Sequence, residues 1–264
     1  MTSTTPVTEC TFQACILVPV YNHQQVVATT LSHLLTENLA IILIDDGSGA
    51  ECRRVLERLA QSSPLIQLLR LPVNRGKGGA LKAGLRAARD RQFSHALQID
   101  ADGQHDTADL KRFITTAREN PAALICGHPI YDNSVPSLRF YARYLTHIWV
   151  WINSLSLAVK DSMCGFRVYP VTAITSLLEQ EAMGNRMEFE SEIAVRWVWR
   201  NGPVINLPTK VAYPEDGVSH FAPWRDNLLI SKMHATLFFG MLWRCPRLLC
   251  RKFKKQQSPQ GERA

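Results

Sequence analysis

Two carboxylates spaced two residues apart are the strongest chemical signal in this chain. They belong to the run Ile99-Asp100-Ala101-Asp102-Gly103-Gln104-His105, which follows a short apolar segment. In an extended segment residues i and i+2 point the same way, so Asp100 and Asp102 present their carboxylates together, with Gln104 next in register. Oxygen ligands grouped in this way suit Mg²⁺ or Mn²⁺ bridging a diphosphate. The alternative is a surface turn that carries two acids.

A second acidic pair ends an earlier apolar run. Asp45 and Asp46 precede a Gly-Ser pair, which is also the pattern of a turn and a helix N-cap. Two strands of one sheet that both end in acids are harder to attribute to turns alone. One pair would bind a metal while an acid on the neighbouring strand accepts hydrogen bonds from a base or ribose. Tyr21 and Asn22 add an aromatic ring and an amide after the first apolar run.

A glycine-rich segment, Asn74-Arg75-Gly76-Lys77-Gly78-Gly79-Ala80-Leu81, follows the third apolar run. Glycines permit close backbone approach, and Arg75 and Lys77 would neutralise phosphate. The segment is not a Walker A loop, because Lys77 is followed by glycine. Nor is it a dinucleotide fingerprint, since Leu81 stands at the third glycine position. The plain alternative is a tight strand-to-helix turn.

Short apolar runs alternate with helix-length amphipathic segments through the first half of the chain, and they must position these side chains. The candidate strands are residues 14–20, 40–45, 65–71, 95–100 and 123–127, and the candidate helices lie near 24–37, 51–61, 77–91 and 107–119. This alternation predicts an α/β fold with a parallel sheet covered by helices. Open parallel sheets bind ligands beyond the carboxyl ends of their strands. Thr107 is the expected N-cap of the last helix.

The alternation stops after His128, and the sequence predicts one long helix from about residue 137 to 160. An apolar stripe at steps of three and four comprises Leu138, Tyr141, Leu145, Ile148, Ile152, Leu155 and Val159, while Phe140, Tyr144 and Trp151 lie off it. Either this helix is buried on two sides or it presents an aromatic face to a lipid interface. The second half of the chain should cover the sheet and shape an acceptor site.

Composition excludes several classes of protein. The 264 residues are 46% hydrophobic and 20% charged, as in globular proteins. The seven cysteines are scattered without a CxxC pair, which argues against a structural zinc site or a disulfide framework. The first residues lack the basic flank and apolar core of a signal peptide, so we expect a cytoplasmic protein. No run reaches the roughly 18 apolar residues that cross a bilayer.

The net charge of +7 is concentrated near the C-terminus, where no acid separates Arg244, Arg247, Arg251, Lys252, Lys254 and Lys255. The preceding segment is rich in Leu, Phe and Trp. Together they predict an amphipathic helix held at an anionic membrane surface and interrupted at Pro246. The alternative is a solvated, frayed terminus. We expect no nucleic-acid partner, because no recognition motif accompanies the charge.

Five segments occur in one order with strand-sized spacing: PVYNH, LIDDGS, NRGKGGALKAG, QIDADGQHD and CGFRVY. With this joint pattern the chain resembles a family 2 glycosyltransferase of the GT-A type, in the dolichyl-phosphate mannose synthase-like branch, over about residues 14–215. The resemblance implies an inverting transfer of a hexose from a UDP- or GDP-sugar, with Mg²⁺ or Mn²⁺ as cofactor. It also implies a lipid or lipid-linked acceptor, polyprenyl phosphate included, at the cytoplasmic face of a membrane.

The resemblance also gives roles to individual residues on the donor side. It implies that the base and ribose are surrounded by Pro19, Tyr21, Ile44 and Asp46. It also implies that Asp100 and Ala101 contact the nucleotide. It implies that the metal at the diphosphate is held by Asp100, Asp102 and Gln104. His220 stands roughly where relatives carry a basic residue toward the diphosphate. The family commonly has Glu in place of His23, so the donor is not copied from the mannose synthases.

On the acceptor side, residues 161–167 match a family segment. The resemblance implies that Asp161 positions the acceptor or acts as a base and that Arg167 binds phosphate, whereas the plain alternatives are a helix cap and a surface arginine. An inverting transfer to a hydroxyl needs a carboxylate to take its proton, and Asp161 and Glu190 are the candidates. A phosphate acceptor needs no base. Glu190 begins a probable helix, where acids are favoured by the helix dipole alone.

These observations predict three segments: a flexible N-terminus at 1–13, a GT-A domain at 14–223, and a membrane-associating segment at 224–264. Within the domain, residues 14–127 would bind the nucleotide and residues 128–223 the acceptor. Two rival functions stay open. A nucleotidyltransferase of the same broad fold would release pyrophosphate, and a non-catalytic membrane adaptor would use only the basic tail.

Overall fold

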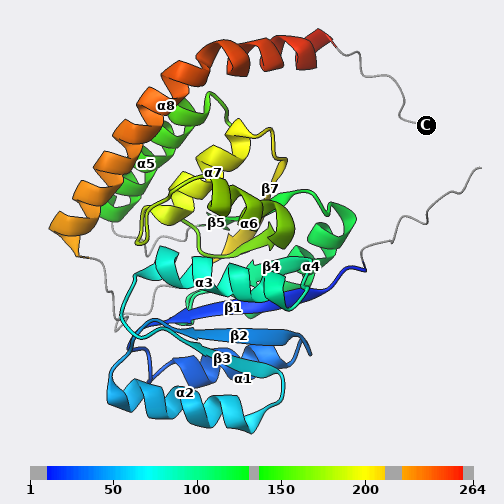
Figure 1. The fold of residues 1–264 in the computed structure, drawn as a ribbon, viewed down its shortest axis with the longest axis vertical. Coiled ribbons are helices and arrows are strands. Elements are labelled where there is room, and N and C mark those ends of the chain that lie inside the picture. The colour runs from blue at the N-terminus through cyan, green and yellow to red at the C-terminus, as the bar shows by residue number, and fades with distance from the viewer. Residues whose placement is uncertain (1–10, 131–136, 212–221, 258–264) are drawn as a thin grey trace, which may run out of the picture.

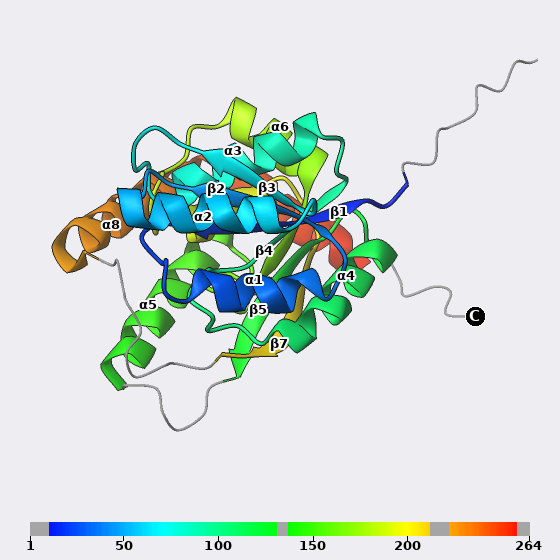
Figure 2. The ribbon, with the colours of Figure 1, turned by 90° about the horizontal axis from the view of Figure 1, so that it is seen from below.

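A seven-stranded sheet with helices on both faces forms the centre of the protein (Figures 1 and 2). The computed structural model describes residues 11–130, 137–211 and 222–257. The strands are β1 (Ala14–Val20), β2 (Ala40–Asp45), β3 (Ile66–Arg70), β4 (His95–Gln98), β5 (Leu124–Ile130), β6 (Arg167–Pro170) and β7 (Val204–Lys210). The helices are α1 (Val27–Leu35), α2 (Ala50–Ser62), α3 (Lys77–Asp90), α4 (Leu110–Glu119), α5 (Ser137–Ser154), α6 (Val171–Gln180), α7 (Phe189–Trp199) and α8 (Pro223–Gln257).

The strand order is β3-β2-β1-β4-β6-β5-β7. The strands β3, β2, β1 and β4 are parallel, β6 runs antiparallel to both of its neighbours, and β7 is parallel to β5. The first four strands therefore bring their carboxyl ends to one edge, as the alternation in the sequence predicts. β5 continues to Ile130, beyond its predicted end, because it pairs with β7 along its whole length.

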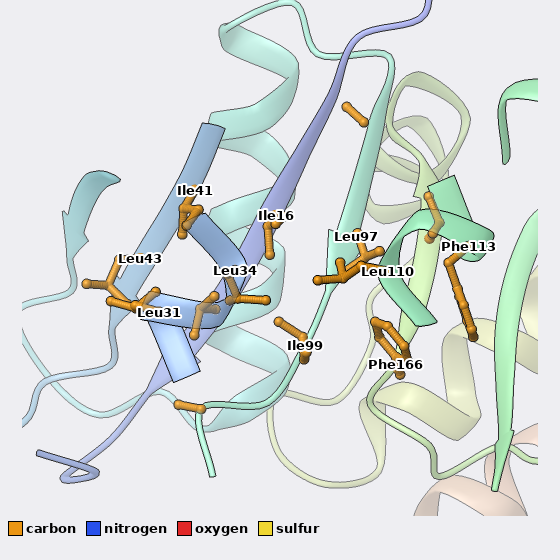
Figure 3. Close-up of a cluster of buried hydrophobic side chains, with 14 of the residues drawn as sticks. Ile16, Leu31, Leu34, Ile41, Leu43, Leu97, Ile99, Leu110, Phe113 and Phe166 are labelled. Carbon is orange, nitrogen blue, oxygen red and sulfur yellow. The ribbon is translucent and has the colours of Figure 1, made fainter. Parts of the chain in front are cut away.

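One face of the sheet is covered by α1, α2 and α4 through a continuous apolar core. Alternate strand residues point to opposite faces of a sheet, so Ile16 and Leu97 share this side. They pack with Leu31 of α1 and Phe113 of α4, as Figure 3 shows. Fully burying a side chain of this size contributes about 1.5–3 kcal/mol, so this layer holds the strand ends firmly in place.

The other face is covered by α3, α6 and α7, which Figure 2 shows in part on the opposite side from α1 and α4. Leu17 and Ile44 of the strands pack there against Leu85 of α3 and Ile193 of α7. A third apolar cluster joins α7 to α5 and α8. As a result α7 is enclosed on almost all sides, with nine of its eleven residues buried.

The outer helix α5 differs from its prediction in two ways. It ends at Ser154, because Leu155 adopts a left-handed φ of 48°. The middle of the predicted apolar stripe also faces outward: Leu145, Ile148 and Ile152 are exposed. The opposite side of the helix packs against α7 and α8 and buries His147, Val150 and Asn153. The expectation of a helix buried on two sides is wrong, because polar residues with partners occupy the inner side.

Two expectations about helix termini are also corrected. Thr107 is not an N-cap; Asp106 accepts the hydrogen bond from the Ala108 N–H, and a short 3₁₀ turn at 107–109 leads into α4. The last helix is not interrupted, because α8 continues through Pro246 to Gln257. Figure 1 shows that it changes direction in its C-terminal part, as a proline inside a helix favours.

Among the described helices, none combines the length and the apolar character needed to cross a membrane. The division of the chain at residue 224 stays a prediction. The N-terminal part of α8 lies along α5, and its C-terminal part passes over the end of α7 (Figure 1).

Candidate active site

Acidic residues gather at the carboxyl ends of two strands, β2 and β4, which lie on either side of β1. β1 lies between β2 and β4, and all three are parallel. Asp45 is the last residue of β2 and Asp46 follows it, while Asp100 and Asp102 follow β4 by two and four residues. The two acidic pairs that stand 55 residues apart in sequence thus reach the same edge of the sheet.

Asp46 holds the glycine-rich turn in place. Its carboxylate accepts hydrogen bonds from the backbone N–H of Arg75 at 2.7 Å and of Gly76 at 2.8 Å, and from the Asn74 side chain at 3.0 Å. Burial raises the pKa of this carboxyl, although the two backbone donors lower it. Gly47 makes the approach possible, since its φ is +70° and a Cβ there would lie 2.5 Å from the Asn74 nitrogen.

Lys77, the first residue of α3, joins two acids from distant parts of the chain. Its ammonium lies 2.8 Å from Asp100 Oδ1 and 3.0 Å from Glu190 Oε1. Burial alone would lower the pKa of Lys77, but the two carboxylates raise it. Burial alone would raise the pKa of Asp100, yet Lys77 and His105 hold it well below its ordinary value. The geometry therefore keeps Lys77 charged and Asp100 ionised.

A buried polar chain continues from Glu190 into the sheet. The Gln98 side chain donates to Glu190 Oε1, and the Tyr169 hydroxyl donates to Gln98 Oε1 at 2.8 Å. Arg167 is fully buried and donates to the backbone carbonyls of Cys164 at 2.9 Å and Glu190 at 2.7 Å. Arg167 thus lies beneath Glu190 and supports the start of α7.

Gly165 sits directly against Asp100. A Cβ built at this position would lie 2.3 Å from Asp100 Oδ2 and 2.7 Å from its Cγ. Real Cβ atoms do not approach so closely, so any side chain here would displace the carboxylate. The segment that follows β4 and the segment that precedes β6 are therefore fitted to each other at this point.

Asp102 and Gln104 lie beside Asp100, and the Gln104 N–H donates to Asp102 Oδ1 at 3.0 Å. Burial raises the pKa of Asp102, and the charge of Asp100 raises it further. Two close carboxylates that repel each other form a donor set that suits a hard divalent cation. No group of three or more His, Cys, Asp or Glu side chains in the described ranges has the arrangement of a metal site. That Asp100, Asp102 and the Gln104 amide hold a metal stays a prediction.

Asp161 lies in a different environment from Glu190. Its carboxylate accepts two hydrogen bonds from Arg143 at 2.8 Å each, and His147 Nε2 lies 3.2 Å away. The backbone N–H groups of Met163 and Cys164 donate to the same carboxylate. Burial would raise the pKa of Asp161, but His147 and Arg143 hold it well below its ordinary range. A carboxylate bound in this way is a weak proton acceptor.

The remaining predicted residues are placed as follows. Pro19 and Tyr21 lie partly buried at the end of β1. Ile44 is a core residue under α3, and Ala101 is buried with its carbonyl 3.3 Å from the Thr30 hydroxyl. His220 lies outside the described residues.

Sequence reasoning missed Gln98, Tyr169, Arg143, His147 and Gly165. Arg143 and His147 stand four residues apart, so they share a helix face, and this spacing was a readable signal. Gln98 was readable as a polar residue inside an apolar strand. Nothing local marks the contact of Gly165 with Asp100, because the two residues meet only in the folded sheet.

Comparison with known proteins identifies the family of this chain. Residues 15–181 match the glycosyl transferase family 2. A dolichyl-phosphate beta-glucosyltransferase of Dictyostelium discoideum is 29% identical over 176 residues, 58% of this chain and 53% of that protein. The human dolichyl-phosphate beta-glucosyltransferase is 25% identical over 60% of this chain and 55% of its own length. The chain thus spans about half the length of these relatives.

Two solved structures share the fold. Glucosyl-3-phosphoglycerate synthase from Mycobacterium tuberculosis, in complex with phosphoglyceric acid, has a TM-score of 0.61 and 17% identity, over 89% of this chain and 81% of that one. A mannosyltransferase from Pyrobaculum calidifontis, in complex with GDP-Man and Mn²⁺, has a TM-score of 0.53 and 15% identity, over 95% and 77%. The expected GT-A type of α/β fold is confirmed. Because the family match covers more than half of the chain, the protein belongs to glycosyl transferase family 2.

Proposed function

We propose that this protein transfers a hexose, with inversion, from a UDP- or GDP-sugar to a lipid phosphate acceptor such as a polyprenyl phosphate. The observation that carries the proposal is the meeting of Asp46, Lys77, Asp100, Asp102 and Glu190 at one edge of the sheet in a family 2 glycosyltransferase. The dolichyl-phosphate glucosyltransferases among its relatives support the class of acceptor.

On the donor side, Asp46 accepts the backbone N–H groups of Arg75 and Gly76 and so fixes the start of α3, where Lys77 supplies the positive charge for phosphate. Tyr21 offers a ring to the base from the end of β1. Asp100, Asp102 and Gln104 would hold Mg²⁺ or Mn²⁺ at the diphosphate. When bound, that ion supplies Lewis-acid charge to the departing nucleoside diphosphate.

On the acceptor side, a phosphate oxygen is already an anion and needs no base. Glu190 then positions Lys77, with Arg167 and Gln98 holding Glu190 in turn. Were the acceptor a hydroxyl, Glu190 would be the better base. Asp161 is committed to Arg143 and His147, and its pKa is lowered.

We propose that the protein meets its acceptor at a membrane surface through α5 and α8. The exposed residues of α8 include Trp224, Leu228, Phe239, Leu242 and Leu249, which fall on one stripe at helical spacing. Leu145, Ile148 and Ile152 of the neighbouring α5 are exposed as well. Exposed apolar stripes on two adjacent helices, with Arg225 and Lys232 beside them, suit an anionic lipid interface.

The experiment is release of UDP or GDP from a panel of nucleotide sugars with Mn²⁺ or Mg²⁺, with and without a membrane lipid extract. Lipid-stimulated release from one donor is expected. Asp102→Asn should reduce that release at least about a hundredfold, because a carboxylate ligand near the developing charge is lost. Asp90→Asn is the matched control, since Asp90 is exposed at the far end of α3.

The outcomes separate the rival functions. Pyrophosphate as the released product would identify a nucleotidyltransferase, and an Asp102→Asn variant with full activity would refute the metal assignment. Folded protein that releases nothing from any donor, yet binds vesicles, would support the adaptor instead.

A further inference from the structure

A hollow of about 370 Å³ lies at the C-terminal end of α7, away from the strand ends. It is lined by Glu181, Trp199, Arg200, Arg244, Arg247 and Arg251. Figure 1 shows α8 passing over this end of the molecule. The hollow is of a size that small ligands occupy. We call it the arginine pocket.

The arginine pocket is separate from the candidate active site. Glu190 lies in the first turn of α7 and Trp199 is its last residue. A helix rises about 1.5 Å per residue, so the two positions lie roughly 14 Å apart along the helix axis. None of the residues that line the pocket contributes to the network of Lys77.

Charge in the arginine pocket is unbalanced. Glu181 is paired with Arg200 at 2.9 Å and also with Arg196, which lies outside the lining. Within the described part of the chain, Arg244, Arg247 and Arg251 form no ion pair. The lining therefore carries four arginines and one glutamate, Glu181, which is already paired, so the net charge of the pocket is strongly positive.

Two of these guanidinium groups are held in place by contacts with described residues that use only one of their N–H donors each. Arg244 stacks on the Trp199 ring, with its Cζ 4.6 Å from the ring centroid, and donates to the Gly240 carbonyl. Arg251 donates to the Trp199 carbonyl at 2.6 Å. A guanidinium has five N–H donors in a planar fork. Holding it in place before a ligand arrives reduces the entropy cost of binding.

A purely structural role accounts for only part of this arrangement. Cations are favourable at helix C-termini, which explains the contact between Arg251 and the last residue of α7. It does not explain Arg247, an exposed residue that lines the pocket without a hydrogen bond among the described residues. Nor does it explain why three arginines that form no ion pair with any described residue converge on a hollow.

We propose that the arginine pocket binds the phosphate group of a small phosphorylated molecule. A phosphate ester carries close to two negative charges and three acceptor oxygens, which match planar guanidinium forks. This site is independent of sugar transfer, since it uses no residue of the proposed donor or acceptor sites.

The position of the arginines on α8 indicates the source of the phosphate. Arg244 and Arg251 continue, at steps of three and four, the buried stripe of Leu237, Met241 and Leu248. The exposed apolar stripe lies on the other side of the helix. The pocket therefore turns away from the surface proposed to meet lipid, which favours a dissolved phosphate compound over a lipid headgroup.

The test is calorimetric titration of the full chain with inorganic phosphate and with glycerol 3-phosphate. Glycerol serves as the uncharged control ligand. The variant Arg244→Gln/Arg247→Gln should weaken phosphate binding at least about tenfold, because each charge-assisted hydrogen bond contributes on that order. The matched variant Arg54→Gln/Lys111→Gln removes the same charge at exposed positions of α2 and α4, outside the pocket and outside α8, and should change affinity less than about threefold. Arg244→Lys/Arg247→Lys keeps the charge but removes the fork, so it should also weaken binding.

A second arm uses vesicles of phosphatidylcholine with and without phosphatidic acid. Binding to phosphatidic acid that depends on the pocket arginines, without binding of dissolved phosphates, would keep the phosphate site and assign its source to the lipid. Equal losses in the two matched Gln variants, or no binding of any phosphate by the wild type, would overturn the proposal. Circular dichroism melting of each variant confirms that loss of binding is not loss of fold.

Discussion

The strand-end site and the α5–α8 surface differ in the side chains that they present and in how those side chains are partnered. At the strand ends, Asp45, Asp46, Asp100 and Asp102 each accept a hydrogen bond or ion pair from the protein itself. On α5 and α8, apolar side chains face outward, and buried polar atoms such as His234 Nε2 have no partner in the described part of the chain. The carboxylates of the first region are held by partners within the chain, whereas the second region exposes apolar side chains.

The largest effect is expected at Asp161, which connects the two regions through Arg143 of α5. Asp161→Asn removes the buried charge that Arg143 and His147 face, so the free energy of unfolding should fall by about 3 kcal/mol. Urea unfolding measures it. Glu57→Gln, which breaks an exposed pair with Arg70, is the control and should cost below about 1 kcal/mol. A stable but inactive Asp161→Asn protein would restore Asp161 as a catalytic base.

Next comes Gly165→Ala, which tests how tightly the strand-end site is fitted. The new Cβ must push the Asp100 carboxylate away, and a displacement near 1 Å can cost about a hundredfold in rate. Nucleotide release from the donor measures the effect. Gly49→Ala is the matched control, since a Cβ there meets only the Asn22 amide oxygen at 3.6 Å. Equal activity in both variants would show that the close contact has no role.

The outer surface is tested by Phe239→Ser/Leu242→Ser. Removing two exposed apolar side chains from α8 should reduce partition onto anionic vesicles at least about tenfold, because each buried side chain contributes about 1.5–3 kcal/mol. Vesicle sedimentation measures the partition. Val26→Ser/Val73→Ser changes two exposed apolar residues elsewhere and should have little effect. Unchanged partition of the α8 variant would remove that helix from the membrane proposal.

The smallest effect concerns the buried His234 between α5 and α8. Burial lowers its pKa from 6.5 to about 4, and Nδ1 accepts a hydrogen bond from Asn153 at 3.1 Å. Between pH 6.5 and about 4 the unfolded chain binds the proton and the folded one does not, so stability falls as the pH falls. The loss should stay below about 1 kcal/mol at pH 6.

Melting curves between pH 7.5 and 5 measure this dependence. In His234→Gln the slope in that window should shrink, because the titrating group is gone while Gln can still accept from Asn153. His33→Gln, which changes an exposed histidine of α1, should keep the wild-type slope. A slope that is the same in all three proteins would assign the pH dependence elsewhere.

The first half of the fold could be predicted because each strand is a continuous apolar run that ends in a turn. Such runs are buried on both faces, so composition alone delimits β1 and β2. Once the strands are parallel neighbours, the acids that follow them must meet. The contact of Asp46 with the glycine-rich turn was not predictable, since it depends on the left-handed backbone at Gly47.

The second half was harder to predict because the sequence does not decide which side of a helix such as α5 is buried. The stripe of α5 has the spacing of a buried face, yet polar His147 and Asn153 found partners inside and turned the stripe outward. Arg143 and His147, one helical turn apart on α5, are the side-chain partners of Asp161. Glu190 contacts Lys77, which lies more than a hundred residues earlier in the sequence. Such pairings depend on the packing of whole elements, which local patterns do not encode.

The enclosure of α7 has a consequence for how this sequence can change over generations. Nine of its eleven residues are buried, whereas only two of the thirteen residues of α2 are. Random replacement along α7 would meet a neighbour at nearly every position, but most of α2 could drift without loss. A selection for activity from randomised libraries of the two helices should return α7 close to its present sequence and α2 as a diverse set.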